Sequence, residues 1–418
     1  MPSRIRRSLS DYRFYTYLAI LGPGLIAANA GNDASGIATY STVGAAFGYS
    51  LLWAFIPMVL SLIIVQEMCV RMGVVTGQGL ADLIREQFGV RWTALIMLTL
   101  LVANTGVIIS EFVGIAQASE LLGVPRYFSI PLAAGLIWWL VVKGSQQRVE
   151  RVFLVMSLVF FSYVISAFVS KPDWEAVAEG FVRPTFHTDT AYLFTIMALI
   201  GTTITPFMQV YVQSSVVEKQ MDKDDLPLAR ADVIVGTTFA CMIGAFIVIS
   251  TAATLHANGI TTIDSAATAA NSLAPIAGEY AKYLFAVGLF GAAMLAMGVL
   301  PLATAYSLSE ALGFEKGISR TFREAPIFLG IFTALILIGS VVALIPGIPQ
   351  IRLLLFTQTI NGVLLPVILF AILSLANNEE IMGEHKNTIW LNLAAGTTAA
   401  IVSVLSVLLI GKTIADMF

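Results

Sequence analysis

The sequence predicts an all-α membrane protein that crosses the bilayer eleven times, as two five-helix halves of opposite orientation and one further helix. Three observations lead to this prediction. Hydrophobic residues make up 57% of the 418 residues and charged residues only 12%, whereas about a quarter of a soluble domain is charged. Apolar runs of about 20 residues, the length of a membrane-spanning helix, recur along the whole chain. Lys and Arg residues concentrate in alternate loops between these runs.

Each apolar run long enough to span the bilayer is expected to be one helix. The basic N-terminus leads straight into the first run, without the short apolar region and small-residue cleavage site of a signal peptide, so we expect this helix to be retained. The segments 171–190 and 257–279 are expected to be exposed connections. The expected helices lie near residues 14–44, 48–71, 92–122, 126–142, 151–170, 191–218, 231–256, 280–312, 325–345, 351–376 and 388–411.

The charges in the loops indicate the orientation, because cytoplasmic loops carry an excess of Lys and Arg. The side that holds the N-terminus collects most of the 23 Lys and Arg residues, so we expect a cytoplasmic N-terminus. With an odd number of helices, the C-terminus is then extracytoplasmic. On the cytoplasmic side, Glu67 precedes Arg71 by one helical turn, which favours an ion pair. The positive residues on the other side are Arg126, Lys171, Arg183, Lys282, Arg352 and Lys412.

Composition and motifs also exclude several classes of function. The two cysteines, Cys69 and Cys241, lie in apolar runs and indicate neither a disulfide framework nor a thiolate metal site. The net charge of −3 is close to neutral, and nothing resembles a nucleic-acid-binding surface. No HExxH or GxSxG motif is present, so we expect no enzyme activity and no cofactor. The expected partners are the lipid bilayer and a transported substrate, and the oligomeric state is left open.

Five helices per half reverse the orientation of the second half, which predicts an inverted repeat. We expect residues 1–170 to form the first repeat, residues 191–376 the second, and residues 388–411 an additional eleventh helix. The first helix of each half contains an interruption of its apolar run. Paired interruptions in corresponding helices point to a binding site at the membrane midplane of a transporter.

The interruption in the first half places a carboxylate, Asp33, inside a membrane-spanning run (residues 22–41, GPGLIAANAGNDASGIATYS). A charged side chain at the bilayer centre costs roughly 2.5 kcal/mol or more, so such a residue indicates an ion or proton site. Gly31 and Gly36 are weak helix formers, which predicts an unwound turn with free carbonyl oxygens beside Asp33. The alternative role for Asp33 is a helix cap bonded to backbone amides.

The interruption in the second half is Pro206, within IGTTITPFMQVYVQSS (residues 200–215). Proline removes a helical hydrogen bond and frees a carbonyl one turn earlier, near Thr202. A cation site is therefore expected between Asp33 and this carbonyl. The alternative for the threonine hydroxyls, including that of Thr205, is a bond to their own helix.

Several motifs, taken in their order and spacing, resemble the NRAMP family of divalent-metal transporters over nearly the whole chain. The resemblance implies a LeuT-like fold, a 5+5 inverted repeat in which helices one and six are unwound at the midplane and hold the metal between them. No single motif carries the resemblance. The motifs are GPG at 22–24, the Asp33 turn followed by IAT, FGYSLLW at 47–53, Gln66 with RMGVVTGQGLADLIREQFG at 71–89, SEFVG at 110–114, the interrupted run ending in two serines, and RLLLFTQ at 352–358 with Pro366 eight residues after Gln358.

The resemblance also implies a metal site, residue by residue. Asp33 matches the aspartate of the family's Asp-Pro-Gly-Asn motif, and Gly36 stands where the family has asparagine. Residues 205–207, Thr-Pro-Phe, stand where the family has Met-Pro-His. Glu111 matches a glutamate expected in a cavity or proton relay, with Ile108 in place of a nearby aspartate. The candidate metal ligands are Asp33, Gly36, Thr202, Thr205 and Gln358.

The departures from the family pattern favour Mg²⁺. A methionine thioether favours manganese or iron, and an oxygen donor in its place, at Thr205 or a nearby carbonyl, removes that preference. Glycine at position 36 deletes a ligand and is expected to open volume. This suits Mg²⁺, which keeps several waters and uses one or two carboxylates. The combination resembles the NRAMP-related magnesium transporter branch, so we expect transport of Mg²⁺, with Mn²⁺ as a second candidate substrate.

Proton coupling is not expected, because a relay needs groups that titrate near the working pH. The three histidines, His187, His256 and His385, lie away from the expected site, and Ile108 and Phe207 replace polar residues of the family. We expect uncoupled, alternating-access transport, driven by a membrane potential that supplies roughly 4.6 kcal/mol per divalent ion per 100 mV.

Two alternatives are open at this point. One is a proton-coupled Mn²⁺ or Fe²⁺ importer of the same family. The other is a sodium-coupled symporter of a small organic substrate on the same fold. An organic anion would call for Lys or Arg at the midplane, and the expected helices at 14–44 and 191–218 contain neither.

Overall fold

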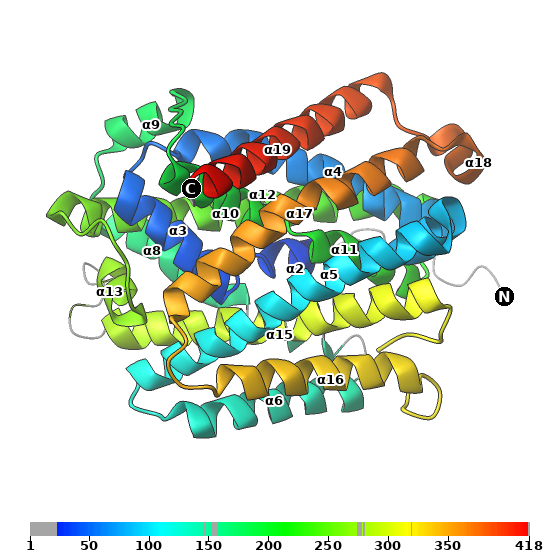
Figure 1. Ribbon diagram of the computed structural model, residues 1–418, viewed down its shortest axis with the longest axis horizontal. Coiled ribbons are helices and arrows are strands. Elements are labelled where there is room, and N and C mark those ends of the chain that lie inside the picture. Colours follow the sequence, from blue (N-terminus) through cyan, green and yellow to red (C-terminus); the bar gives the residue numbers. More distant parts are fainter. Residues whose placement is uncertain are drawn as a thin grey trace, which may run out of the picture.

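The protein, seen in a computed structural model, is an assembly of closely packed helices (Figure 1). The structure describes residues 23–416, except 145–147, 150, 153–154, 156, 274–277, 279–280 and 319. Within these residues every regular element is a helix. The α-helices are α2 (Pro23–Asn29), α3 (Ala34–Phe47), α4 (Phe55–Thr76), α5 (Leu80–Leu121), α6 (Arg126–Lys143), α8 (Phe161–Val169), α9 (Trp174–Val182), α10 (Thr190–Thr203), α11 (Pro206–Glu218), α12 (Leu226–Thr254), α13 (Ala266–Ala270), α15 (Ala281–Leu312), α16 (Pro326–Ala343), α17 (Gln350–Asn377), α18 (Glu379–Met382) and α19 (Ile389–Ala415). The short 3₁₀ helices are η1 (Leu52–Ala54), η2 (Ser157–Phe160), η3 (Lys223–Asp225), η4 (His256–Asn258), η5 (Asn271–Leu273) and η7 (Gly383–His385).

Eight helical segments of the described chain are long and apolar enough to cross a membrane. Burial separates central from peripheral segments: in the most apolar stretch of Thr190–Glu218, 94% of the residues are buried, against 28% in Ile389–Ala415. The predicted spans near 14–44, 126–142 and 151–170 are not among the eight. Part of the first, residues 14–22, lies outside the described residues, and the count of eleven stays a prediction.

Helices α10 and α11 lie at the centre, where nearly all of their residues are buried. α10 is apolar or small on nearly every face, as expected of a helix buried on all sides, whereas α11 also buries the polar side chains of Gln209 and Gln213. α10 packs against α17 and α3, and α11 packs against α4, α15 and α2. The long helices α5 and α15 run side by side, and α16 and α6 cover them along one face (Figure 1). The more exposed α19 packs against α17, α10 and α4.

Both predicted helix interruptions are confirmed. The first lies between α2, which ends at Asn29, and α3, which begins at Ala34. The second lies between α10, which ends at Thr203, and α11, which begins at Pro206. The second break follows from the chemistry of proline, which has no N–H to donate to the preceding turn of a continuing helix.

Two expected boundaries differ from the structure. α5 begins at Leu80 and not near residue 92, and Gly89 within it has a φ of 72°, which only glycine adopts readily and which kinks the helix. The connection expected at 171–190 contains the short helix α9. The side chain of Asp173 caps this helix by accepting hydrogen bonds from two backbone N–H groups in its first turn.

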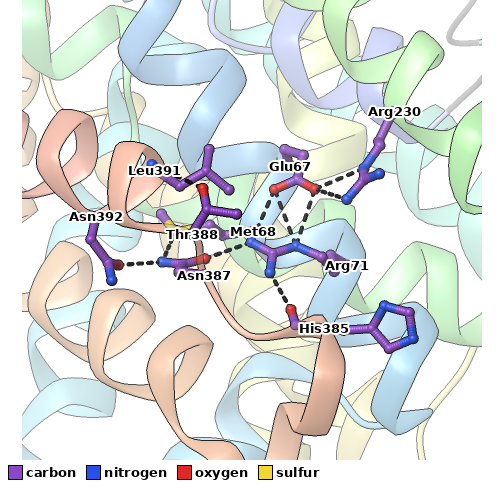
Figure 2. A network of polar contacts seen from close by, with 9 residues as sticks. All are labelled: Glu67, Met68, Arg71, Arg230, His385, Asn387, Thr388, Leu391 and Asn392. Atoms are coloured by element: carbon purple, nitrogen blue, oxygen red, sulfur yellow. Dashed lines mark hydrogen bonds and ion pairs between the residues drawn. The ribbon is translucent and has the colours of Figure 1, made fainter.

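A polar network at one end of α4 joins three segments that lie far apart in the sequence (Figure 2). The predicted ion pair of Glu67 and Arg71 is confirmed, with 3.1 Å between Arg71 Nε and Glu67 Oε1. Glu67 also pairs with Arg230 near the start of α12. Arg71 donates hydrogen bonds to the carbonyl of His385 and to the side chain of Asn387. The network therefore fastens α4 to α12 and to the chain that leads into α19.

Candidate metal site

Asp33 is the residue directly before α3 and is fully buried. Its Oδ1 accepts a hydrogen bond of 2.5 Å from the backbone N–H of Gly36, so Asp33 caps the start of α3. Its second oxygen, Oδ2, accepts a long hydrogen bond of 3.4 Å from the side-chain amide of Gln358 on α17. The cap role and a ligand role are compatible, because Oδ2 is not part of the cap.

Glu111 on α5 brings a second buried carboxylate to the same helix start. Its Oε2 accepts from the N–H of Ala34 at 2.9 Å, and its Oε1 accepts from the N–H of Ser35 at 3.2 Å and from the Ser35 hydroxyl at 2.9 Å. The N–H groups at a helix start have no partners within the helix and carry a partial positive charge. Glu111 therefore anchors α3, and its role in a cavity or relay stays a prediction.

Among the described residues, no positive side chain forms an ion pair with either of these two carboxylates. The ion pairs formed by the described residues include neither Asp33 nor Glu111. The partial charges at the start of α3 offset only part of two buried negative charges, and a buried charge needs a counter-charge to be stable. A cation beside Asp33 would supply that counter-charge.

The second helix break brings further oxygen atoms to the first. The carbonyl of Thr202 has no helical partner, because the residue four positions later is Pro206, which has no N–H. The hydroxyl of Thr202 donates to the carbonyl of Gly31 in the first break at 3.2 Å. The hydroxyl oxygen of Thr205 is buried and has no hydrogen-bond partner in the described part of the chain. The two breaks therefore touch, and the second contributes a carbonyl without a helical partner and a hydroxyl without a partner among the described residues.

The expectation of open volume at Gly36 is wrong for this conformation. A Cβ atom at this position would lie 2.5 Å from the carbonyl oxygen of Gly31 and 2.9 Å from the hydroxyl oxygen of Thr202. The physical reason is that the first break folds over the first turn of α3 and fills the space beside the glycine. Gly36 contributes its N–H, which fixes Asp33, and no side chain.

Gln358 reaches the site because α10 and α17 make direct backbone contact. A Cβ atom on Gly201 would lie 1.9 Å from the carbonyl oxygen of Gln358, and one on Gly362 would lie 2.5 Å from the carbonyl oxygen of Met197. The absence of a side chain at these glycines permits the approach. Sequence reasoning identified Gln358 but missed Asn361, which donates a hydrogen bond of 3.0 Å to the Gln358 amide oxygen. The feature of the sequence that could have indicated Asn361 is its i, i+3 spacing from Gln358, which places the two amide side chains next to each other on one helix.

The chemistry of the donors is that of a hard-cation site. Among the described residues, no three His, Cys, Asp or Glu side chains gather in one place. His256 is not at the candidate site, because its ring nitrogen forms a hydrogen bond with a backbone carbonyl near the far end of α3. The terminal methyl of the buried Met208 lies against the backbone of Gly31. Carboxylate, amide, hydroxyl and carbonyl oxygens are the ligands that Mg²⁺, Ca²⁺ and Mn²⁺ accept.

Sequence comparison identifies the family. The model of the natural resistance-associated macrophage protein-like (Nramp) family matches residues 24–412. The chain belongs to the Nramp family. Relatives include the divalent metal cation transporter MntH of Deinococcus radiodurans, which is 29% identical over 361 residues that cover 81% of this chain and 82% of that protein. The MntH of Klebsiella pneumoniae is 27% identical over 409 residues, which cover 96% and 95% of the two chains.

Structural comparison confirms the predicted fold class of this Nramp protein. The manganese transporter of Eremococcus coleocola superposes with a TM-score of 0.77 at 18% identity, covering 100% of this chain and 90% of that one. MhsT, solved in complex with L-phenylalanine, superposes with a TM-score of 0.58 at 14% identity, covering 93% and 98% of the two chains. At these identities the likeness shows the LeuT-type fold alone. Nramp proteins are membrane transporters and not enzymes, and they carry their metal as substrate, without a cofactor.

Proposed function

We propose that this Nramp protein transports divalent metal ions, principally Mg²⁺ and secondarily Mn²⁺, by uncoupled alternating access driven by the membrane potential. The observation that carries the proposal is the Asp33 carboxylate, which is buried at the junction of two broken helices and has no ion-pair partner in the part of the chain that the structure describes. A buried, unpaired carboxylate beside free carbonyl oxygens is what a cation site in a membrane requires. The proposed orientation places the N-terminus in the cytoplasm and the C-terminus outside.

The proposed ligands share one property, since each offers an oxygen atom. Asp33 offers Oδ2, Thr202 its free carbonyl, Thr205 its unpartnered hydroxyl and Gln358 its side-chain amide. Gly36 acts through its N–H, which holds the carboxylate in position. An all-oxygen set removes the advantage that softer ligands give to Mn²⁺ and Fe²⁺, and a single carboxylate is enough for Mg²⁺ with retained waters.

The proposed absence of proton coupling rests on the surroundings of the site. Ile108 packs its side chain against Gly339 of α16, so an apolar contact occupies the position where an acidic residue was expected from the family resemblance. Glu111 is bonded to the start of α3 by three hydrogen bonds, which fits an anchor better than a group that must gain and lose protons. The membrane potential alone supplies roughly 4.6 kcal/mol per divalent ion per 100 mV.

A flux experiment tests the proposal. Purified protein in lipid vesicles is given Mg²⁺, Mn²⁺ or Ca²⁺ outside, and ion entry and internal pH are followed at zero and at negative internal potential. We expect Mg²⁺ entry that increases with negative potential, no acidification at zero potential, and at least tenfold slower entry for Asp33→Ala, because an intramembrane ion ligand is lost. Asp264→Ala, at an exposed carboxylate, is the control and should match the wild type.

The same experiment decides between the proposal and its two alternatives. Entry of Mn²⁺ with acidification and no entry of Mg²⁺ would support a proton-coupled importer. The name of the Eremococcus coleocola manganese transporter favours Mn²⁺ as a substrate, and the name of the MntH relatives specifies only a divalent metal cation. No flux of any divalent ion would point to a symporter of an organic substrate. The latter has less support, because α2, α3, α10 and α11 contain no Lys or Arg.

A further inference from the structure

Asn361 is a fully buried amide on α17, one helical turn after Gln358 of the candidate site. Its Nδ2 donates a hydrogen bond of 3.0 Å to Oε1 of Gln358. Its own oxygen, Oδ1, has no hydrogen-bond partner among the described residues. A buried polar atom without a partner is uncommon and calls for an explanation.

The orientation of Gln358 supplies that explanation. Its nitrogen Nε2 points to Asp33 Oδ2, at 3.4 Å, and its oxygen Oε1 points to Asn361. The N–H group suits a free carboxylate, because it offsets part of the negative charge. It does not suit a cation, which is attracted to the oxygen end of an amide and repelled by the N–H end. Gln358 must therefore turn its amide by half a turn to become a ligand.

A half-turn of Gln358 is compatible with the fold only if Asn361 turns as well. After the turn, Nε2 of Gln358 faces Asn361 and needs an acceptor, because a buried N–H without a partner is costly. The Oδ1 of Asn361 can be that acceptor, since it has no other partner to lose. The two amides keep one mutual hydrogen bond in both arrangements, with its direction reversed, and the atom of Asn361 without a partner is then Nδ2 in place of Oδ1.

We propose that Asn361 is a positioning residue for the transported ion, acting through a paired reversal of the Gln358 and Asn361 amides. Without the ion, Gln358 donates to Asp33 and accepts from Asn361. With the ion, Gln358 presents its oxygen to the ion and donates to Asn361. This role rests on the proposed function, because it requires a cation at Asp33.

Two substitutions at Asn361 are expected to have different effects on the Mg²⁺ affinity. Asn361→Leu removes the donor of the ion-free arrangement and the acceptor of the reversed one. Because a buried N–H without a partner is tolerated less often than a carbonyl oxygen without one, we expect Mg²⁺ binding to the purified protein to weaken by about fivefold. Asn361→Asp keeps an acceptor and removes the donor that favours the ion-free arrangement, so Mg²⁺ affinity should equal or exceed that of the wild type. A merely structural Asn361 would instead make both variants bind Mg²⁺ more weakly. Calorimetric titration measures the affinity and thermal unfolding checks the fold.

A matched background isolates the effect of orientation. In Gln358→Glu both terminal atoms of the side chain are carboxylate oxygens, so either can face the ion and position 358 has no amide that must turn. In that background, Asn361→Leu should change the Mg²⁺ affinity by less than about twofold, which is the non-additivity expected of coupled residues. Equal weakening in both backgrounds would overturn the role of Asn361. Mg²⁺ binding that survives Asp33→Ala unchanged would instead overturn the site at Asp33, and the proposed function with it.

Discussion

At the scale of single residues, Thr205 shows how a ligand can be distinguished from a structural threonine. Its buried hydroxyl has no hydrogen-bond partner among the described residues, whereas Thr195 and Thr203 donate to carbonyls of their own helix α10. Bonding to its own helix is the common arrangement for a threonine in a membrane-spanning helix. The exception lies at the helix break, where a partner from outside the chain, an ion or its bound water, can satisfy the hydroxyl.

Thr205→Val removes this hydroxyl and keeps the shape of the side chain. We expect Mg²⁺ affinity to fall about tenfold, the equivalent of 1.4 kcal/mol, while the ion-free protein unfolds at an equal or higher temperature, because no protein hydrogen bond is lost. Calorimetric titration and thermal unfolding in detergent measure the two quantities. Thr195→Val, whose hydroxyl bonds the carbonyl of Ala191, is the control and should leave Mg²⁺ affinity unchanged. Unchanged affinity in Thr205→Val would contradict the ligand role.

The sequence predicts the position and burial of Asp33 better than the surroundings of Gly36, for a physical reason. A carboxylate inside an apolar run is stable in few arrangements. Both roles predicted for Asp33, ion ligand and helix cap, require the same helix break. The space beside Gly36 depends on contacts with Gly31 and Thr202. Thr202 is distant in the sequence, and this contact exists only when the two breaks have come together.

At the scale of helices, breaks are encoded locally and packing is not. Pro206 ends α10 by itself, because it lacks an N–H. The register of α10 against α17 depends instead on the close approach of Gly201 to the Gln358 carbonyl. Nothing in either helix alone indicates that these glycines meet. Gln358 could thus be predicted by resemblance, but its contact with Asp33 and the participation of Asn361 could not.

The network around Arg71 gives a prediction at the same scale (Figure 2). Arg71→Gln removes the donor shared by Glu67, the His385 carbonyl and Asn387. Breaking a buried pair by removing one partner costs roughly 3–5 kcal/mol, and we expect the lower end because Arg230 still pairs with Glu67. The measurement is unfolding in detergent.

The control for Arg71→Gln is an ion pair of the same helical spacing on the surface. Arg183 and Glu179 pair with side chains that are 76% and 57% exposed. Such pairs contribute between zero and about 1 kcal/mol, so Arg183→Gln should leave unfolding nearly unchanged. Equal effects of the two substitutions would show that the Arg71 network does not fasten α4 to its neighbours.

At the scale of the whole molecule, the candidate site is shielded from solvent in this conformation, since Asp33 and Gln358 are fully buried. Two carboxylates fasten the half-helices α2 and α11. Asp232 on α12 accepts from the N–H of Gly24 at 2.7 Å, and Glu310 on α15 accepts from the Ser214 hydroxyl at 2.7 Å. In the proposed orientation, these contacts lie on the cytoplasmic side. Release of an ion to that side then requires α2 or α11 to move and these contacts to separate.

The helical architecture was predictable because a bilayer permits few kinds of spanning backbone. Hydropathy alone locates the eight segments that are long and apolar enough to cross a membrane. The inverted-repeat boundaries and the orientation of the termini rest on loop charges and stay predictions. The all-helical membrane class follows from composition, whereas the site follows from contacts between helix breaks that lie far apart in the sequence.

The proposed position of the transported ion is at Asp33, between the two helix breaks. Anomalous X-ray scattering from crystals grown with Mn²⁺ can locate the ion there, because Mn²⁺ is both a candidate substrate and a strong anomalous scatterer. We predict a peak at coordination distance from Asp33 Oδ2, with the oxygen end of Gln358 turned toward it, and loss of the peak in Asp33→Ala. A peak remote from both breaks, or one that persists in Asp33→Ala, would show that Asp33 does not bind the transported ion.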